Sequence, residues 1–203
     1  MAIKGLELVT VALVDENQQI IKGADKGLSE SGIYEIDTKD MGTKTANITG
    51  MEGTSTKVWG NNQMQDMAIG AASPSIALAI NNLNFKIRNM LLGNEPDGKG
   101  GFVYSGKKPN VAILVQSHSV KTNQSVYFGF GYGIMGMASQ NIGTNTENET
   151  REDDSLTFTA LTTKAFNGQP IKFWSEAEEG FDKKTMMSEV FGGYVAPTVT
   201  TGN

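Results

Sequence analysis

Residues 125–135 read SVYFGFGYGIM, a run of aromatic and β-branched residues interrupted by glycines. Such residues favour strands, and the run contains neither proline nor a charged residue. Apolar side chains at alternate positions predict one apolar face, and the glycines predict an opposite face that a backbone or a bulky ring can approach closely. The apolar set is Val126, Phe128, Phe130, Tyr132 and Ile134, and the glycines are Gly129, Gly131 and Gly133. The stretch therefore predicts a long β-strand.

Shorter runs of the same kind recur along the chain, separated by Gly, Asn, Asp and Pro. Residues 156–160 (LTFTA) alternate cleanly between apolar and polar side chains, which is typical of a strand with one buried face. The turn at 15–18 is expected to return the first strand in a hairpin over 19–21. The expected strands are Leu6–Val14, Ile33–Ile36, Thr54–Trp59, Ser75–Ile80, Gly101–Tyr104, Val111–Gln116, Ser125–Met135, Ser155–Thr163 and Ile171–Trp174. Many short strands of this kind predict a mainly β protein, a sandwich or a barrel.

One segment predicts a helix beside these strands. Leu83, Ile87, Met90 and Leu91 share a stripe on a helix over about 83–92, with Asn81 or Asn82 as the N-cap and Gly93 after the last turn. Phe85 and Leu92 would lie on the far face, so the helix is expected to be covered on both sides. The alternative is a strand that continues from Ile80. A second, shorter helix is predicted over Lys183–Phe191, with Asp182 as its cap.

The remaining segments predict long loops within a single domain over 1–195. Loops are expected at Ser29–Gly32, Asp37–Gly53 and Asn141–Asp154, and residues 196–203 are expected to form a flexible tail. Long loops in a compact domain usually have a function. Leu6–Val14 and Ser125–Met135 are largely uncharged and free of proline, so as free sheet edges they would pair with other copies of the chain.

Composition excludes several classes of protein. The chain has 203 residues, one histidine (His118), no cysteine and a net charge of −5 without a basic cluster, which argues against thiolate sites and nucleic-acid binding. No apolar run is long enough to cross a membrane, and the N-terminus lacks a signal-peptide core, so we expect synthesis in the cytoplasm. The G-x-G-x-x-G match at 131–136 is not followed by a helix, and the Ser-x-x-Lys match at 105–108 lies in a polar turn. No enzyme site, cofactor or metal is therefore expected.

Read along its length, the chain resembles the major tail proteins of long-tailed, non-contractile phages of Gram-positive bacteria. The matching motifs, in order, are GADKGL at 23–28 with GIY at 32–34, ANITG at 46–50, VWGNNQ at 58–63, the 83–93 segment ending in LLG, PNVA at 109–112 and NTENET at 145–150 before the LTF strand. The resemblance implies a tail-tube fold with one flanking helix, and a virion protein that forms stacked hexameric rings through which phage DNA passes without specific binding. It also implies partners: the chain itself, a tape measure protein, and tail terminator and distal tail proteins.

The resemblance and the sequence together single out two sets of residues for assembly. Candidate subunit contacts are Phe85, Leu92, Trp59, Asn61, Asn62 and Gly131. Candidate residues of ring-stacking or lumen loops are Thr43, Lys44, Glu147, Glu149, Glu152, Asp153 and Asp154. The acidic run at 147–154 should be exposed, and it either repels its copies or pairs with basic residues, first of all Lys183 and Lys184. Alternatives are another virion, baseplate or decoration protein, and a carbohydrate-binding sandwich that uses Trp59 or Trp174.

Overall fold

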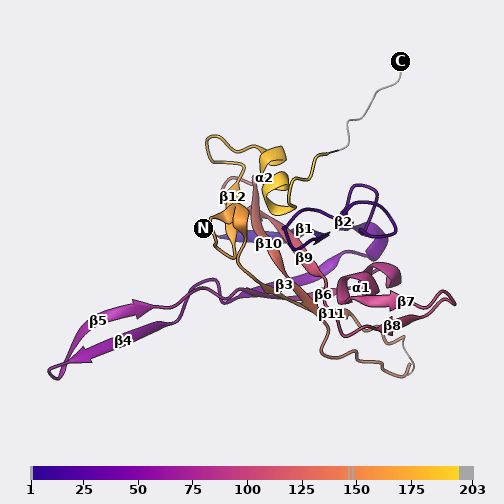
Figure 1. The fold of residues 1–203 in the computed structure, drawn as a ribbon, viewed down its shortest axis with the longest axis horizontal. Coiled ribbons are helices and arrows are strands. Elements are labelled where there is room, and N and C mark those ends of the chain that lie inside the picture. Colours follow the sequence, from indigo (N-terminus) through magenta and orange to yellow (C-terminus); the bar gives the residue numbers. More distant parts are fainter. Residues whose placement is uncertain (1, 146, 148, 197–203) are drawn as a thin grey trace, which may run out of the picture.

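The computed structural model describes residues 2–145, 147 and 149–196 and is mainly β (Figure 1). The flexible tail predicted over residues 196–203 therefore lies almost entirely outside the described residues. The strands are β1 (Ile3–Val14), β2 (Ile33–Ile36), β3 (Thr43–Thr49), β4 (Ser55–Gly60), β5 (Gln63–Ile69), β6 (Ser75–Ile80), β7 (Asn94–Pro96), β8 (Phe102–Tyr104), β9 (Asn110–Ser119), β10 (Ser125–Gly136), β11 (Asp154–Ala160) and β12 (Lys172–Ser175). The helices are α1 (Phe85–Leu92) and α2 (Lys183–Val190), with 3₁₀ turns η1 (Thr38–Asp40) and η2 (Lys164–Phe166).

Eight strands form one antiparallel sheet. Seven of them follow the order β2-β1-β9-β10-β11-β6-β3. The eighth, β12, pairs with the first part of β10, along residues 126–129, whereas β11 pairs with its last part, along residues 133–136. In the described part of the chain β2 and β3 end the sheet without pairing with each other, so it does not close into a barrel. The prediction of a mainly β fold is confirmed. The strands expected to be free edges are interior: β1 lies between β2 and β9, and β10 lies beside β9.

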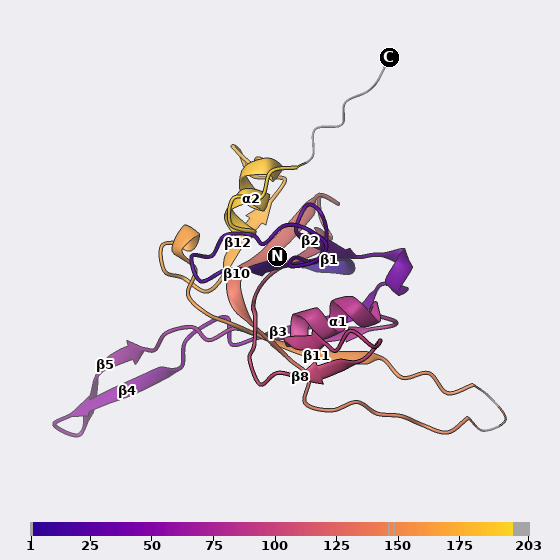
Figure 2. The ribbon, with the colours of Figure 1, turned by 45° about the vertical axis from the view of Figure 1, so that its right-hand side comes forward.

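Each face of the sheet carries one helix and one hydrophobic core. On one face Ile87 and Leu91 of α1 pack with residues of β1, β6, β9 and β11. On the other face Met186 and Val190 of α2 pack against Ala12, Leu114 and their neighbours. Figure 2 shows the two helices on opposite sides of the sheet. The arrangement is a twisted sheet between two short helices.

Both helices have the predicted caps, with one change. The side chain of Asn84, rather than Asn81 or Asn82, accepts hydrogen bonds from the N–H groups of Lys86 and Ile87, and Gly93 ends α1 in the left-handed conformation. Asp182 caps α2 by accepting from the N–H of Thr185. The helical prediction is therefore confirmed over the continuous-strand alternative.

One prediction of local structure is wrong, and another is confirmed only in part. The segment Asp37–Gly53 is not one long loop, because it contains η1 and β3, which pairs with β6 along its whole length. Its sequence, TKTANIT, lacks the apolar run that marks a buried strand because only Ala46 and Ile48 turn toward the core. The expected first hairpin is reduced to a single bridge between Val14 and Ile20, after which the chain leaves the sheet.

A bulge in β10 also changes the predicted faces of that strand. The register with β9 shifts between Phe130 and Gly133, so that Gly131 and Tyr132 both turn toward the α2 side. Phe128 and Phe130 belong to the α1 side as expected. After the bulge the alternation is reversed, which buries Met135 and leaves Ile134 39% exposed. The predicted single apolar face therefore extends only as far as Phe130.

Candidate assembly surfaces

The longest projection of the molecule is the hairpin β4–β5, which with its flanking residues 50–74 extends far from the sheet (Figures 1 and 2). We call this segment the arm. All seven residues of β5 are exposed, and neither hydrophobic core contains a residue of the arm. Its exposed large apolar side chains are Met51, Val58, Trp59, Met64, Met67 and Ile69. A two-stranded hairpin has little stability by itself, so these side chains indicate a surface that another molecule covers.

The turn at the tip of the arm explains two of the predicted contact residues. Asn61 and Asn62 both have positive φ, 50° and 62°, which is the conformation of a two-residue type I′ turn. Asparagine tolerates this conformation better than most residues, and so the NN pair sets the register in which Gly60 faces Gln63. Trp59, next to the turn, is 66% exposed. These three predicted residues therefore lie together at the outer end of the arm.

The outer edge of β3 is a second open surface. One edge of β3 pairs with β6, and among the described residues no strand is hydrogen-bonded to the other edge. The strand has no proline, and Lys44 is its one charged residue. Edge strands with little charge and no proline pair readily with other chains.

The long loop between β10 and β11 projects from the end of the sheet that lies farthest from α2 (Figures 1 and 2). Its exposed acidic residues are partly paired: Glu149 with Arg151 at 2.9 Å, and Asp153 with Lys44 at 3.0 Å. The second pair joins the base of the loop to the edge strand β3. Two predicted loop residues that are distant in the sequence are therefore neighbours in space.

Asp154 does not belong to this exposed set. It is the first residue of β11, is 9% exposed and accepts hydrogen bonds from Arg88 Nη1 (2.7 Å) and the N–H of Leu83 (3.0 Å). The prediction that it lies in an exposed loop is wrong, because the N-terminal part of α1 covers it. Thr43, at the start of β3, is half-buried.

The two residues predicted on the far face of α1 differ in their surroundings. Phe85 is 56% exposed, with its ring edge-on to Phe102 at 5.7 Å between centroids. Leu92 is only 5% exposed and belongs to the core, so its predicted place on the far face is wrong. The chain returns past the end of the helix, where Lys108 Nζ donates to the carbonyl of Leu92 at 3.0 Å, and this return encloses the last turn.

Gly131 is buried inside the subunit. A Cβ at this position would lie 2.5 Å from the Thr163 methyl group and 3.3 Å from the carbonyl oxygen of Val190. The close approach that the glycines predicted therefore occurs within one chain. Trp174 is half-buried, with its ring 5.7 Å from that of Phe166 and the ammonium of Lys172 5.1 Å from its centroid. Its surroundings do not form an open platform for a sugar.

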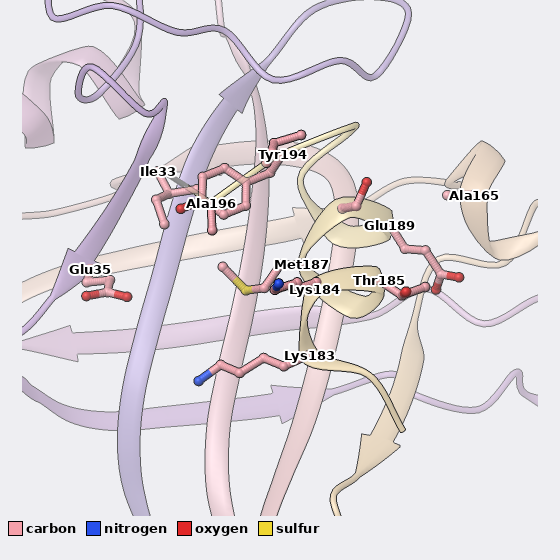
Figure 3. Close-up of a pocket in the computed structure, with 12 residues that line it drawn as sticks. Ile33, Glu35, Ala165, Lys183, Lys184, Thr185, Met187, Glu189, Tyr194 and Ala196 are labelled. Carbon is pink, nitrogen blue, oxygen red and sulfur yellow. The ribbon is translucent and has the colours of Figure 1, made fainter. Parts of the chain in front are cut away.

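A groove of about 1000 Å³ lies between α2, β2 and residues 194–196 (Figure 3). Ile33, Met187 and Tyr194 form its apolar part. Lys183 and Lys184 of α2 are exposed on one side, and Glu35 of β2 lies on the other. Burial and the charge of Glu35 raise the pKa of Tyr194 above its usual value. Sequence patterns did not predict the groove, because it forms where β2 meets α2 and residues 194–196, which are distant from β2 in the sequence. We call it the α2 groove.

The acidic residues and the histidine are the side chains whose clusters could hold a metal ion. Among the described residues no three His, Asp or Glu side chains are close enough together to hold a metal ion. His118 Nδ1 lies 3.8 Å from a carboxylate oxygen of Glu7 at the surface of β1. Over the same residues no helix has the length and apolar character needed to cross a membrane.

Comparison with known proteins gives one clear result. A family model described as phage tail tube protein matches residues 1–199. Among curated proteins none matches the chain. The family match includes the sheet, both helices, the arm and the β10–β11 loop.

Proposed function

The chain belongs to the phage tail tube protein family, and we propose that it assembles as hexameric rings that stack into the hollow tube of a long, non-contractile tail. As a tail tube protein it is a structural component of the virion tail. In this proposal phage DNA passes through the lumen into the host without being specifically bound. A tape measure protein and the terminator and distal tail proteins are its other partners.

The observation that carries the proposal is the family match over 1–199, and the structure supplies surfaces that suit it. The sheet is open at β2 and β3, so copies related by a closed rotation could continue one another's sheets and leave no bare edge. The arm is too exposed to stabilise its own subunit and long enough to reach another. The net charge of −5 suits a duct that must not hold phosphate.

Electron microscopy of the purified protein tests the proposal directly. Negatively stained samples and sedimentation velocity, over a range of protein and salt concentrations, should show rings and tubes rather than monomers. Six-fold symmetry in averaged end views would support the hexamer, and another symmetry would overturn that number alone. A protein that stayed monomeric at high concentration under every salt condition would contradict tube formation.

Phe85 is the proposed lateral contact of α1, and a pair of variants separates contact from folding. Phe85→Asp changes an exposed ring and should leave a folded subunit that assembles poorly. Ile87→Asp places a charge in the core and should unfold the subunit. If Phe85→Asp assembled like the wild type, this face of α1 would not be a subunit contact.

A further inference from the structure

We propose that the β10–β11 loop of one subunit docks in the α2 groove of a second copy of the chain. In this contact Ile142 enters the apolar part of the groove, and Glu147 and Glu152 meet Lys183 and Lys184. The inference rests on the proposed assembly and identifies which surfaces meet between successive subunits.

The loop carries one apolar side chain and two carboxylates that the subunit itself does not use. Ile142 is 88% exposed, the largest exposed fraction among the large apolar residues described. Glu149 and Asp153 already have partners in Arg151 and Lys44. Within the described part of the chain neither Glu147 nor Glu152 forms an ion pair. The loop therefore presents an apolar residue next to two unpaired negative charges.

The α2 groove has an apolar surface and two positive charges, which complement the side chains of the loop. Ile33, Met187 and Tyr194 provide an apolar surface for the isoleucine. Lys183 and Lys184 are exposed, and the ion pairs found in the described residues include neither. The groove lining contains two carboxylates, Glu35 on the β2 side and Glu189 of α2, and Glu189 is already paired with Lys172. The two lysines therefore give the groove a positive side at the start of α2. Charge complementarity of this kind selects partners and fixes their register.

The positions of the two surfaces suit a repeating contact. The loop and α2 lie at opposite ends of the subunit in both views (Figures 1 and 2). A surface at one end that fits a different surface at the other gives a head-to-tail contact, which can repeat without limit along a line of subunits. Residues 197–203 read PTVTTGN and carry no acidic side chain, so they match the two lysines less well than the loop does.

Charge exchange in the full-length protein tests the contact. One variant carries Glu147→Lys and Glu152→Lys, and a second carries Lys183→Glu and Lys184→Glu. Each alone should form tubes only at about tenfold or higher protein concentration than the wild type, because like charges then face each other. An equimolar mixture of the two should restore tubes, because each reversed loop meets a reversed groove. The variant Glu178→Lys with Glu179→Lys makes the same charge change away from both surfaces and should polymerise normally.

Further measurements separate this inference from the proposed function. Wild-type tubes would support the function whatever the variants do, and circular dichroism should show all variants folded. Ile142→Asp should weaken tube growth like the charge reversals, and added salt should loosen wild-type tubes. The docking would be overturned if the two charge-reversal variants polymerised normally, or if their mixture did no better than either alone. It would also be overturned if deletion of 197–203 abolished tubes while the charge reversals did not.

Discussion

Asp154 Oδ1 lies 2.7 Å from Arg88 Nη1, and this pair attaches α1 to the first residue of β11. The other carboxylate oxygen accepts from the N–H of Leu83, just before the helix. The pair is largely buried, with side-chain exposures of 22% and 12%. The carboxylate of Asp154 thus joins the N-terminal end of α1 to the end of the β10–β11 loop.

Asp154→Ala should therefore destabilise the subunit by about 3 kcal/mol, because it leaves the Arg88 guanidinium without its buried partner. Asp153→Ala is the matched control: its pair with Lys44 is exposed and should contribute less than about 1 kcal/mol. Urea unfolding of the two variants measures both values. Equal losses for the neighbouring aspartates would contradict the role given to Asp154.

Gly131→Val should cost about 1–3 kcal/mol of unfolding free energy, because its side chain would overlap the Thr163 methyl group under α2. Gly136→Ala, at the end of the same strand, is the control, since a Cβ there would meet only the carbonyl oxygen of Thr157 at 3.8 Å. Thermal unfolding of the two variants compares them. A nucleotide that stabilised the wild type in the same assay would instead indicate a ligand site at these glycines.

The hydroxyl of Tyr127 donates to Glu176 Oε1 at 2.7 Å, and this bond predicts a pH dependence. It lowers the pKa of Glu176 below its usual value of about 4.5, and burial with the nearby carboxylate raises the pKa of Tyr127 to about 12. The carboxylate stabilises the fold above about pH 4.5, and this contribution is lost as the pH falls through the lowered pKa. The phenol stabilises the fold below pH 10, and its contribution is lost as the pH rises toward 12.

Tyr127→Phe should remove both effects and cost about 1–2 kcal/mol at neutral pH. The difference in stability from the wild type should shrink below pH 4 and above pH 10. Tyr104→Phe, at a ring that is 71% exposed, should leave the stability profile unchanged. Chemical unfolding at several pH values makes the measurement, and a constant difference across the range would exclude this link.

Replacing β4 and β5 by a short turn should abolish polymerisation and leave the subunit folded. The N–H of Gly70 donates to the carbonyl of Thr54 at 3.0 Å, so an Asn-Gly pair in place of 55–69 can close the arm at this bond as a type I′ turn. Asn62→Gly retains both the arm and its turn and should polymerise normally. Electron microscopy and sedimentation decide the outcome, and tubes from the shortened protein would show that the arm is dispensable.

The Thr43–Gly50 segment, expected from the sequence to be a removable stacking loop, should behave differently. It forms β3, and Ala46 and Ile48 pack against the core, so its deletion should destabilise the fold itself. Circular dichroism and thermal unfolding would test this. A fully stable deletion variant would contradict the structural role of β3.

Much of the fold follows from local sequence. Strands such as Ile33–Ile36 and Ser75–Ile80 have the predicted bounds, because their β-branched residues end at turn formers. Both helices have recognisable caps, since a cap depends on residues within one turn of the chain. The ordered motifs along the chain also predicted the tail tube family, which the family match confirms.

Tertiary structure decided the rest, because it depends on which distant segments meet. The sequence alone indicated most strands of the sheet but not the polar β3, and pairing placed β10 in the sheet interior and β3 at an edge. Leu92 and Asp154 are buried only because residues 105–109 return past α1 and Leu83 lies over the start of β11. The α2 groove likewise requires β2, α2 and residues 194–196 together. Local propensity acts over one or two turns of chain, whereas burial and register are set by contacts across the whole chain.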